Sequence, residues 1–322
     1  MDIYESAIEI LTDELFLRDW PELQSIFERA SLNSPRDWRL PVVSCEAVGG
    51  MHEQAVAAVA SIACLQIAII LIDDMLDVDP RGEYQRLGMA PVANMASALQ
   101  AAGMEIVAQS GAAWNAKLLA LQSLNRMMLK TALGQYMDIQ NPEDEAAYWE
   151  VVRTKSSPFF GAALNVGALL GGAAPDIAAR IERFGCLYGE MIQIHDDLND
   201  TMAVPANPDW TLDRSPLPIL YAQTVQYADR EKFLELRRAL PDPEALKEAQ
   251  IILIRCGAIS YAVHQLILKH KLARELLKKT SSIDITGLEK LLDDVIQPVM
   301  KMFAAIGIAH PEIMLEPPIV HF

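Results

Sequence analysis

The run AVAAVASIACLQIAIILIDDMLD, residues 55–77, joins eighteen almost uninterrupted apolar residues to three aspartates. Its apolar part, residues 55–72, predicts one long helix. Eighteen apolar residues are also enough to span a bilayer. The stretch nevertheless contains Ser61 and Gln66, and it has neither a basic flank nor an aromatic belt. We therefore expect a helix buried at the centre of a large helical domain, where apolar residues are needed on every side.

The rest of the chain indicates one all-α domain covering residues 1–322. Ala, Leu, Met, Glu and Gln dominate, and few stretches alternate β-branched residues with polar ones. Breaks such as residues 140–145, 171–176 and 203–210 separate about 10–12 helices. None of these breaks is long or polar enough to be a linker between domains.

Composition narrows the partners and the location of the protein. A net charge of −16 argues against binding nucleic acid, which requires a basic surface. The four cysteines lie far apart in apolar surroundings and are interpreted as reduced and structural. The N-terminus lacks the basic region and cleavage site of a signal peptide. We expect a cytoplasmic enzyme with no transmembrane segment.

Two aspartate clusters with the spacing D-D-x-x-D are the strongest chemical signal. The first cluster is Asp73, Asp74 and Asp77, and the second is Asp196, Asp197 and Asp200. On a helix, side chains one turn apart face the same way, so each cluster can aim at one volume. One such motif arises by chance in roughly one chain in ten of this composition, whereas two arise far more rarely.

Carboxylate oxygens suit Mg²⁺, which is usually held by one or two carboxylates together with substrate phosphates. Two clusters that face each other across a cavity would hold several Mg²⁺ ions. Those ions would attract a polyanion that the aspartates alone would repel, and a diphosphate is the natural candidate. The alternative is that the clusters are solvated acidic ends of surface helices, which seldom follow so apolar a run.

Beyond these clusters, the chain resembles the trans-isoprenyl diphosphate synthase (polyprenyl synthetase) family of the class I isoprenoid synthase superfamily. DDMLD (73–77) and DDLND (196–200) match the two aspartate-rich motifs of that family. GQYMD (134–138) is similar to its G-Q-x-x-D, and residues 153–172 are similar to its K-T-x-x-L-F-x-A-A stretch. The resemblance covers most of the chain. It implies a single bundle of helices around a central active-site cavity, the isoprenoid synthase fold.

The resemblance also implies which residues bind the substrate. The six aspartates would be catalytic as ligands of about three Mg²⁺ ions, and Lys155 would help them to turn an allylic diphosphate into a leaving group. The residues implied to contact the substrate are Lys155, Ser156, Gln193, Arg214, Gln66, Arg81 and Arg86. Lys155 and Arg214 could instead be solvated cations, and Gln66 could be a hydrogen-bonded core residue.

The N-terminal part of the chain departs from the family pattern. Chain-elongating members carry G-G-K-x-x-R-P, whose Lys and Arg bind the second substrate, isopentenyl diphosphate. In the corresponding stretch here, residues 33–50, neither a lysine nor an arginine falls in register, although Arg36 and Arg39 lie near. Each lost charge-assisted contact to a buried diphosphate would cost about 1.5–3 kcal/mol. One diphosphate subsite therefore looks intact and the other eroded.

These observations favour an enzyme that ionises one allylic prenyl diphosphate, geranylgeranyl or farnesyl diphosphate, without using isopentenyl diphosphate. Such an enzyme would be an unusual terpene synthase or prenyltransferase. The alternative is a chain-elongating trans-polyprenyl diphosphate synthase with a rewired second site. A third hypothesis, an idle subunit of a heteromeric synthase, fits poorly with two retained metal motifs.

Pocket depth and oligomeric state follow from weaker signals. Ile69 and the small Ala68, four and five residues before Asp73, favour a deep pocket and the longer geranylgeranyl chain. Members of the family are commonly homodimers, and we expect a homodimer here. AVAAVASIA (55–63) could supply a small-residue contact between helices of two chains.

Overall fold

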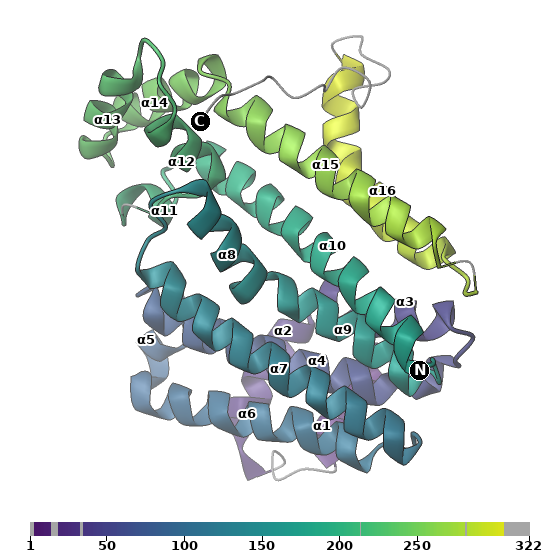
Figure 1. The fold of residues 1–322 in the computed structure, drawn as a ribbon. Helices are drawn as coiled ribbons and strands as arrows, with labels where there is room; N and C mark the ends of the chain where they lie inside the picture. The colour runs from purple at the N-terminus through teal and green to yellow at the C-terminus, as the bar shows by residue number, and fades with distance from the viewer. Residues whose placement is uncertain (1–2, 14–18, 33–34, 213, 281, 306–322) are drawn as a thin grey trace.

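A computed structural model describes residues 3–13, 19–32, 35–212, 214–280 and 282–305, which form helices and no strands (Figure 1). The twelve longer helices are α1 (Ile3–Asp13), α2 (Pro21–Ser31), α4 (His52–Leu76), α6 (Met89–Gln109), α7 (Trp114–Ile139), α8 (Glu145–Lys155), α9 (Ser157–Leu170), α10 (Pro175–Met202), α13 (Arg230–Arg238), α14 (Pro243–Arg255), α15 (Ala258–Lys278) and α16 (Thr286–Ala305). The shorter ones are α3 (Leu40–Ala47), α5 (Tyr84–Leu87), α11 (Pro208–Thr211), α12 (Leu217–Thr224) and the 3₁₀ helix η2 (Arg36–Arg39). The all-α prediction is confirmed, whereas the predicted single domain also includes residues 306–322, which lie outside the described part.

Helix α4 is buried in the chain's own core, as its apolar sequence predicts. Every residue from Ala58 to Leu65 has no exposed surface. By length and composition α4 could cross a membrane, but 67% of its most apolar window is buried among other helices. The stretch 55–63 packs within the core, so it does not provide the intermolecular contact that the sequence suggested.

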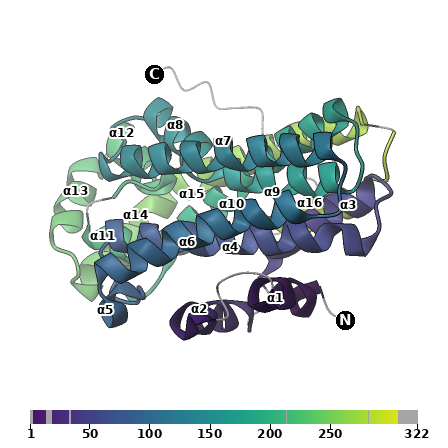
Figure 2. The same cartoon turned by 90° about the horizontal axis from the view of Figure 1, so that it is seen from below.

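Two further helices complete the centre of the bundle. All of α9 is buried, and it packs between α3, α7 and α10. α10 crosses the middle of the molecule and is covered on its other side by α15 (Figure 1). Seen from below, α6 and α7 lie side by side nearest the viewer, and α1 and α2 cover a different edge of the bundle (Figure 2). This arrangement leaves α4, α7, α8, α9 and α10 to enclose a common space.

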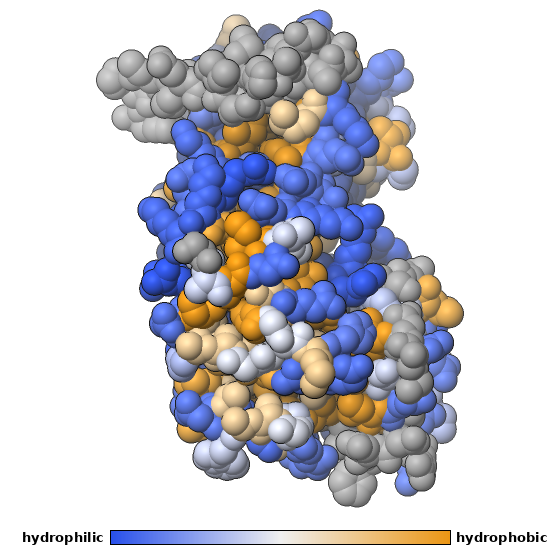
Figure 3. Space-filling view, turned by 90° about the vertical axis from the view of Figure 1, so that its right-hand side faces the viewer, coloured by the Kyte–Doolittle hydropathy of each residue, from blue (hydrophilic) through white to orange (hydrophobic). Residues whose placement is uncertain are grey.

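The chain has a net charge of −16, and charged side chains are expected on the outside of the bundle. On the face shown in Figure 3, hydrophilic residues are numerous across the middle, and hydrophobic residues show between them, most extensively in the lower half. An apolar interior and a charged exterior are what the high hydrophobic content and the acidic balance require.

A close contact between α7 and the junction of α8 with α9 positions polar residues at the cavity. Pro158 lies in the first turn of α9, where the missing N–H of proline is tolerated, so α8 ends at Lys155 and a new helix begins. Gly134 of α7 faces this junction. A Cβ atom at Gly134 would lie 2.2 Å from the backbone nitrogen of Lys155. Only glycine therefore allows α7 to approach the end of α8 so closely.

This contact predicts that Gly134→Ala destabilises the protein. Alanine is the better helix former by about 1 kcal/mol, but the added methyl group would collide with backbone atoms, and overpacking costs about 1–3 kcal/mol or more. We expect a net loss of about 1–2 kcal/mol in the free energy of unfolding, measured by urea denaturation. Gly111→Ala is the control, because a Cβ at Gly111 meets nothing within 4 Å. Equal stability of the two variants would contradict the packing argument.

Candidate active site

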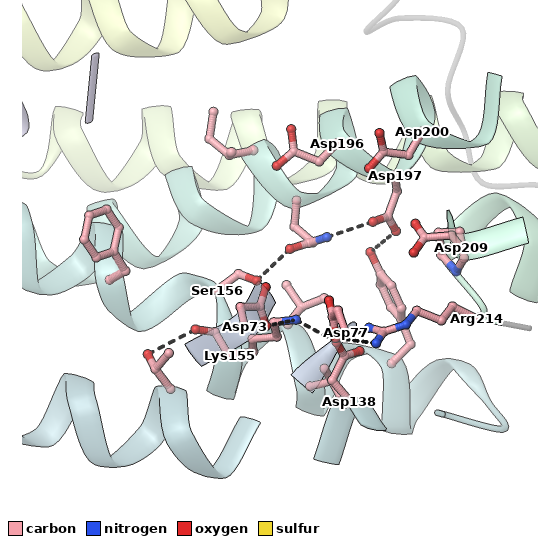
Figure 4. A pocket seen from close by; sticks show the side chains of 18 of the residues that line it. Asp73, Asp77, Asp138, Lys155, Ser156, Asp196, Asp197, Asp200, Asp209 and Arg214 are labelled. Carbon is pink, nitrogen blue, oxygen red and sulfur yellow. Dashed lines mark hydrogen bonds and ion pairs between the residues drawn. The ribbon is translucent and has the colours of Figure 1, made fainter. Parts of the chain in front are cut away.

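Both aspartate clusters lie at the carboxyl end of a long helix. α4 carries the first cluster in its last turn and at its C-cap, and α10 carries the second within its last two turns. A helix has partial negative charge at its C-terminus, so the backbone reinforces the field of the carboxylates and favours cations. Figure 4 shows Asp73 and Asp77 on one side of the pocket and Asp196, Asp197 and Asp200 on the other.

A cavity of about 460 Å³ separates the two clusters. Its apolar wall is formed by Ile69, Ile70, Val151, Val152, Phe159, Phe160 and Ile192. Ten of the thirteen predicted site residues line it: Asp73, Asp77, Asp196, Asp197, Asp200, Lys155, Ser156, Gln193, Arg214 and Gln66. Residues far apart in sequence, from α4, α8, the junction of α8 with α9, α10 and the loop before α12, therefore meet around one space that has a polar rim and a hydrocarbon wall.

Three predicted site residues do not line the cavity. The side chain of Arg81 is 83% exposed and pairs with Asp79 at 2.8 Å. Arg86 pairs with Glu83 at 3.0 Å. Asp74, next to Asp73 on α4, does not line the cavity and is half-buried. Neither arginine lines the cavity, although Arg81 is close enough to Asp200 of the second cluster to oppose the rise in the pKa of that carboxyl.

Asp138 of α7 connects the two cations of the site. Lys155 Nζ lies 2.7 Å from Asp138 Oδ2 and 3.1 Å from Asp73 Oδ1. Arg214 Nη1 lies 3.2 Å from the same Asp138 oxygen, and Arg214 also pairs with Asp77. The sequence motif GQYMD contains Asp138, but sequence reasoning assigned it no role. Its position places both cations beside the first aspartate cluster.

Asp197 is buried and accepts three hydrogen bonds, unlike the other aspartates of its cluster. Tyr148 Oη and the backbone N–H of Leu217 each donate to Oδ2 at 2.7 Å, and Gln193 Nε2 donates to Oδ1 at 2.8 Å. Ser156 Oγ in turn donates to Gln193 Oε1 at 2.6 Å. Burial raises the pKa of Asp197, and these donors oppose that rise. Asp197 therefore ties α8, α10 and α12 together at the cavity wall.

The cavity carries far more negative than positive charge. Among the described residues, its lining includes two cations, Lys155 and Arg214, and eight aspartates: Asp37, Asp73, Asp77, Asp138, Asp196, Asp197, Asp200 and Asp209. Burial, with Asp200 and Asp197 nearby, raises the pKa of Asp196 to about 7. Burial, with Asp79 and Asp73 nearby, raises the pKa of Asp74 to about 6. Raised values of this kind mark carboxylates that are partly desolvated and have other carboxylates beside them.

This donor set fits divalent cations that bind together with a phosphate ligand. Among the described residues, no three His, Cys, Asp or Glu side chains converge to form a metal site by themselves. Mg²⁺ does not require such a site, because it keeps several waters and uses one or two carboxylates plus phosphate oxygens. Asp73, Asp77, Asp196 and Asp200 would be the ligands, since they line the cavity and retain accessible oxygens.

Two further aspartates in the cavity were not anticipated from the sequence. Asp37 comes from η2, in a stretch where only the arginines were considered, and Asp209 follows the second cluster in a loop and short helix. Burial, with Asp200 and Asp197 nearby, raises the pKa of Asp209 to about 6. Neither residue has a spacing that marks it in the sequence, because a loop can direct a side chain anywhere that packing allows.

Gln66 and the arginines near η2 occupy distinct positions. Gln66 lines the cavity and donates to Asp37 Oδ2 at 2.9 Å. Arg36 and Arg39, by contrast, are exposed and do not line the cavity. Among the described residues, Lys155 and Arg214 are therefore the cationic side chains that line the cavity.

Comparison with known proteins places the chain among prenyl diphosphate synthases. The polyprenyl synthetase family model matches residues 39–251. The chain is 29% identical over 262 residues to a short chain isoprenyl diphosphate synthase of Methanothermobacter thermautotrophicus, covering 76% of this chain and 80% of that protein. It is 28% identical over 236 residues to a geranylgeranyl pyrophosphate synthase of Geoglobus acetivorans, covering 69% and 73%.

Solved structures share the fold. A geranylgeranyl pyrophosphate synthetase of Pyrococcus horikoshii superimposes with a TM-score of 0.77 at 20% identity, covering 91% of this chain and 94% of that one. A polyprenyl synthase of Caulobacter crescentus, complexed with calcium and isoprenyl diphosphate, superimposes with a TM-score of 0.74 at 17% identity, covering 91% of each chain. The predicted isoprenoid synthase fold is confirmed by these likenesses.

The raised aspartate pKa values predict how stability depends on pH in the absence of metal. A carboxyl whose pKa is higher in the folded than in the unfolded chain contributes stability that is lost as the pH rises through the folded pKa. With pKa values of about 6 for Asp74 and about 7 for Asp196, we expect the Tm to fall by about 2–4 °C between roughly pH 5.5 and pH 8.

Thermal melts in EDTA, followed by circular dichroism, would measure this. Asp196→Asn should flatten the profile, whereas Asp176→Asn, at an exposed position near the start of the same helix, should not. A Tm that is constant or rises over this range would show that the pKa values of these carboxyls are not raised in the folded chain.

Proposed function

The chain belongs to the polyprenyl synthetase family, and from that premise we propose that it transfers the prenyl group of an allylic diphosphate and releases inorganic diphosphate. The observation that carries the proposal is the pair of aspartate clusters facing each other across one cavity, with Lys155 and Arg214 beside the first cluster. An idle subunit would have no reason to keep so much negative charge at a single cavity, since each carboxylate there raises the free energy of the folded chain.

One part of the cavity binds the diphosphate and the other binds the prenyl chain. Lys155 and Arg214 bind the diphosphate oxygens and neutralise the charge that develops as the allylic C–O bond breaks. Asp73, Asp77, Asp196 and Asp200 would hold Mg²⁺, which would supply further positive charge to the leaving group. The apolar wall around Phe159 and Phe160 holds the prenyl chain and keeps water from the carbocation.

The acceptor we propose first is isopentenyl diphosphate, which makes the reaction a chain elongation. The support comes from relatives named as short chain, geranylgeranyl and geranylfarnesyl diphosphate synthases, each aligned over most of its own length. This order reverses the one that the sequence favoured. We take geranylgeranyl or farnesyl diphosphate as the allylic substrate class.

One observation supports a second candidate function. In that function the protein ionises one allylic diphosphate and does not use isopentenyl diphosphate. A second diphosphate needs its own cations, yet the only cations lining the cavity in the described part of the chain are Lys155 and Arg214. Both lie at the aspartate rim. The product would then be a hydrocarbon or an alcohol rather than a longer diphosphate.

The two candidates are separated by incubating the protein with Mg²⁺ and geranylgeranyl or farnesyl diphosphate, with and without isopentenyl diphosphate. Chain elongation predicts a longer prenyl diphosphate only when both substrates are present, detected by liquid chromatography and mass spectrometry. The second candidate predicts a hydrocarbon or alcohol in either case. If no diphosphate is released under any of these conditions, the proposed function is wrong.

Replacing one aspartate from each cluster tests the metal assignment. Asp73→Asn and Asp196→Asn should each lower the rate of diphosphate release by at least about 100-fold, because each removes a ligand charge from one side of the leaving group. Asp176→Asn serves as the matched control on α10. The assignment fails if both cluster variants retain the rate of the unaltered protein while remaining folded.

We also propose that two copies of the chain form a homodimer through the outer face of α7. Trp114, Leu118, Leu129, Leu133 and Tyr136 are exposed there at helical spacing, with exposed fractions of 43–78%. Several exposed apolar side chains on one face of a long surface helix mark a candidate interaction site. α7 lies on the side of the bundle nearest the viewer in Figure 2.

Light scattering after gel filtration should give twice the chain mass of 35.6 kDa. The double variant Leu129→Glu with Leu133→Glu should give the monomer mass, because two buried charges would oppose association. Leu32→Glu is the control, since Leu32 is 80% exposed but lies at the end of α2. A monomeric unaltered protein, or a dimer that survives the double variant, would rule out this interface.

A further inference from the structure

The backbone that carries Arg214 is held by a residue outside the cavity. Arg214, Ser215 and Pro216 lie in no helix, between α11 and α12. The side chain of Arg214 lines the cavity, whereas its backbone carbonyl accepts a hydrogen bond from Nη2 of Arg237. Arg237 belongs to α13 and is 7% exposed. Of the described residues that line the cavity, none comes from α13.

Packing in the core fixes the position of Arg237. Phe233 lies four residues before Arg237, so the two side chains share one face of α13. Phe233 is fully buried, and its ring packs edge-on against Trp210 of α11 with the centroids 6.2 Å apart. Trp210 Nε1 in turn donates to the carbonyl of Thr201, in the last turn of α10. α13 is therefore held beside the end of the helix that carries the second aspartate cluster.

Further hydrogen bonds fix the backbone next to Arg214. The backbone N–H of Arg214 donates to the carbonyl of Asp209 at 2.9 Å. Ser215 Oγ donates to Gln223 Oε1 at 3.1 Å, and Arg230 Nε, at the start of α13, donates to the carbonyl of Gln223 at 2.9 Å. α13 thus supports this stretch at two points. Only the bond from its buried arginine is made to Arg214 itself.

The backbone contact matters because the side-chain contacts of Arg214 involve groups that a ligand would also bind. The guanidinium pairs with Asp77, and its Nη1 lies 3.2 Å from Asp138 Oδ2. Asp77 is one of the aspartates that would hold Mg²⁺, so its charge would then no longer be committed to Arg214. The hydrogen bond from Arg237 is made to a carbonyl and does not compete with a ligand in the cavity. It can hold Arg214 both before and after a diphosphate binds.

We propose that Arg237 is a positioning residue, which holds the Arg214 carbonyl so that the Arg214 guanidinium points at the leaving diphosphate. This inference rests on the proposed function. Arg237 touches neither the substrate nor the reacting atoms, and it acts through Arg214. A displacement of about 1 Å in a group of the site can cost up to about 100-fold in rate, so a contact outside the cavity can change the reaction.

A double-mutant cycle tests this role. Arg237→Gln removes the contact, because glutamine is shorter than arginine, and Arg214→Gln removes the guanidinium. For the unaltered protein, both single variants and the double variant, two quantities are measured. The first is the Kd of inorganic diphosphate in the presence of Mg²⁺, by isothermal titration calorimetry. The second is kcat/KM for diphosphate release from geranylgeranyl or farnesyl diphosphate, with and without isopentenyl diphosphate.

The expected result is a loss that depends on Arg214. Arg237→Gln should weaken diphosphate binding and lower kcat/KM by about tenfold each, and Arg214→Gln should do so by about 100-fold. The double variant should match Arg214→Gln within about twofold, because Arg237 has nothing left to position. A merely structural role would instead give the same loss from Arg237→Gln in both backgrounds. That result, or no loss when Arg214 is present, overturns the proposal.

Two more variants complete the test. Arg238→Gln removes the exposed neighbouring arginine of α13 and should leave both quantities unchanged. Arg237→Lys keeps a charged donor and should restore part of the binding. If circular dichroism shows that Arg237→Gln does not fold, Arg237→Lys replaces it in the cycle, with a loss of about threefold that vanishes in the Arg214→Gln background.

Failure of the proposed function gives a different result. If the unaltered protein binds inorganic diphosphate but releases none from any prenyl substrate, the proposed function is wrong, and the cycle of Kd values still decides whether Arg237 positions Arg214. If the unaltered protein neither binds nor releases diphosphate, the proposed function and the role of Arg237 are both overturned.

Discussion

The structure depends on one electrostatic constraint: in the part of the chain that the structure describes, eight aspartates and two cations line a single cavity. Two long helices end at this cavity, and their dipoles add to its negative potential. The folded chain can accept this repulsion because α4 and α9 are buried along most of their length. The large apolar core therefore does more than hold the bundle together. It allows a site whose excess of carboxylates suits divalent cations that bind together with an anionic ligand.

Two aspartates organise the site rather than simply adding charge. Asp138 holds Lys155 and Arg214 beside the first cluster, and Asp197 accepts hydrogen bonds from three segments of the chain. Both aspartates meet their partners because helices pack closely. For Asp138, the close approach of α7 to Lys155 depends on Gly134. The cations are consequently positioned before any ligand binds, which lowers the reorganisation needed to stabilise a leaving diphosphate.

The cavity has two chemically different ends. Its rim combines carboxylates with both cations, and its wall includes the apolar side chains of Phe159, Phe160 and Ile192. Chains of this fold that share only about one residue in five with this one keep the same overall architecture.

The sequence by itself determined the all-α class, the buried central helix and the two aspartate clusters, because hydrophobic runs and one-turn spacings are properties of a single helix. It also identified ten residues that meet at the cavity. Only the tertiary structure decided that Asp37, Asp138 and Asp209 join them, and that Arg81 and Arg86 bind neighbouring acids outside the cavity. The physical reason is that helical periodicity fixes which side chains share a face. Where a loop or helix end lies, and which distant groups it meets, follows from long-range packing that no local pattern records.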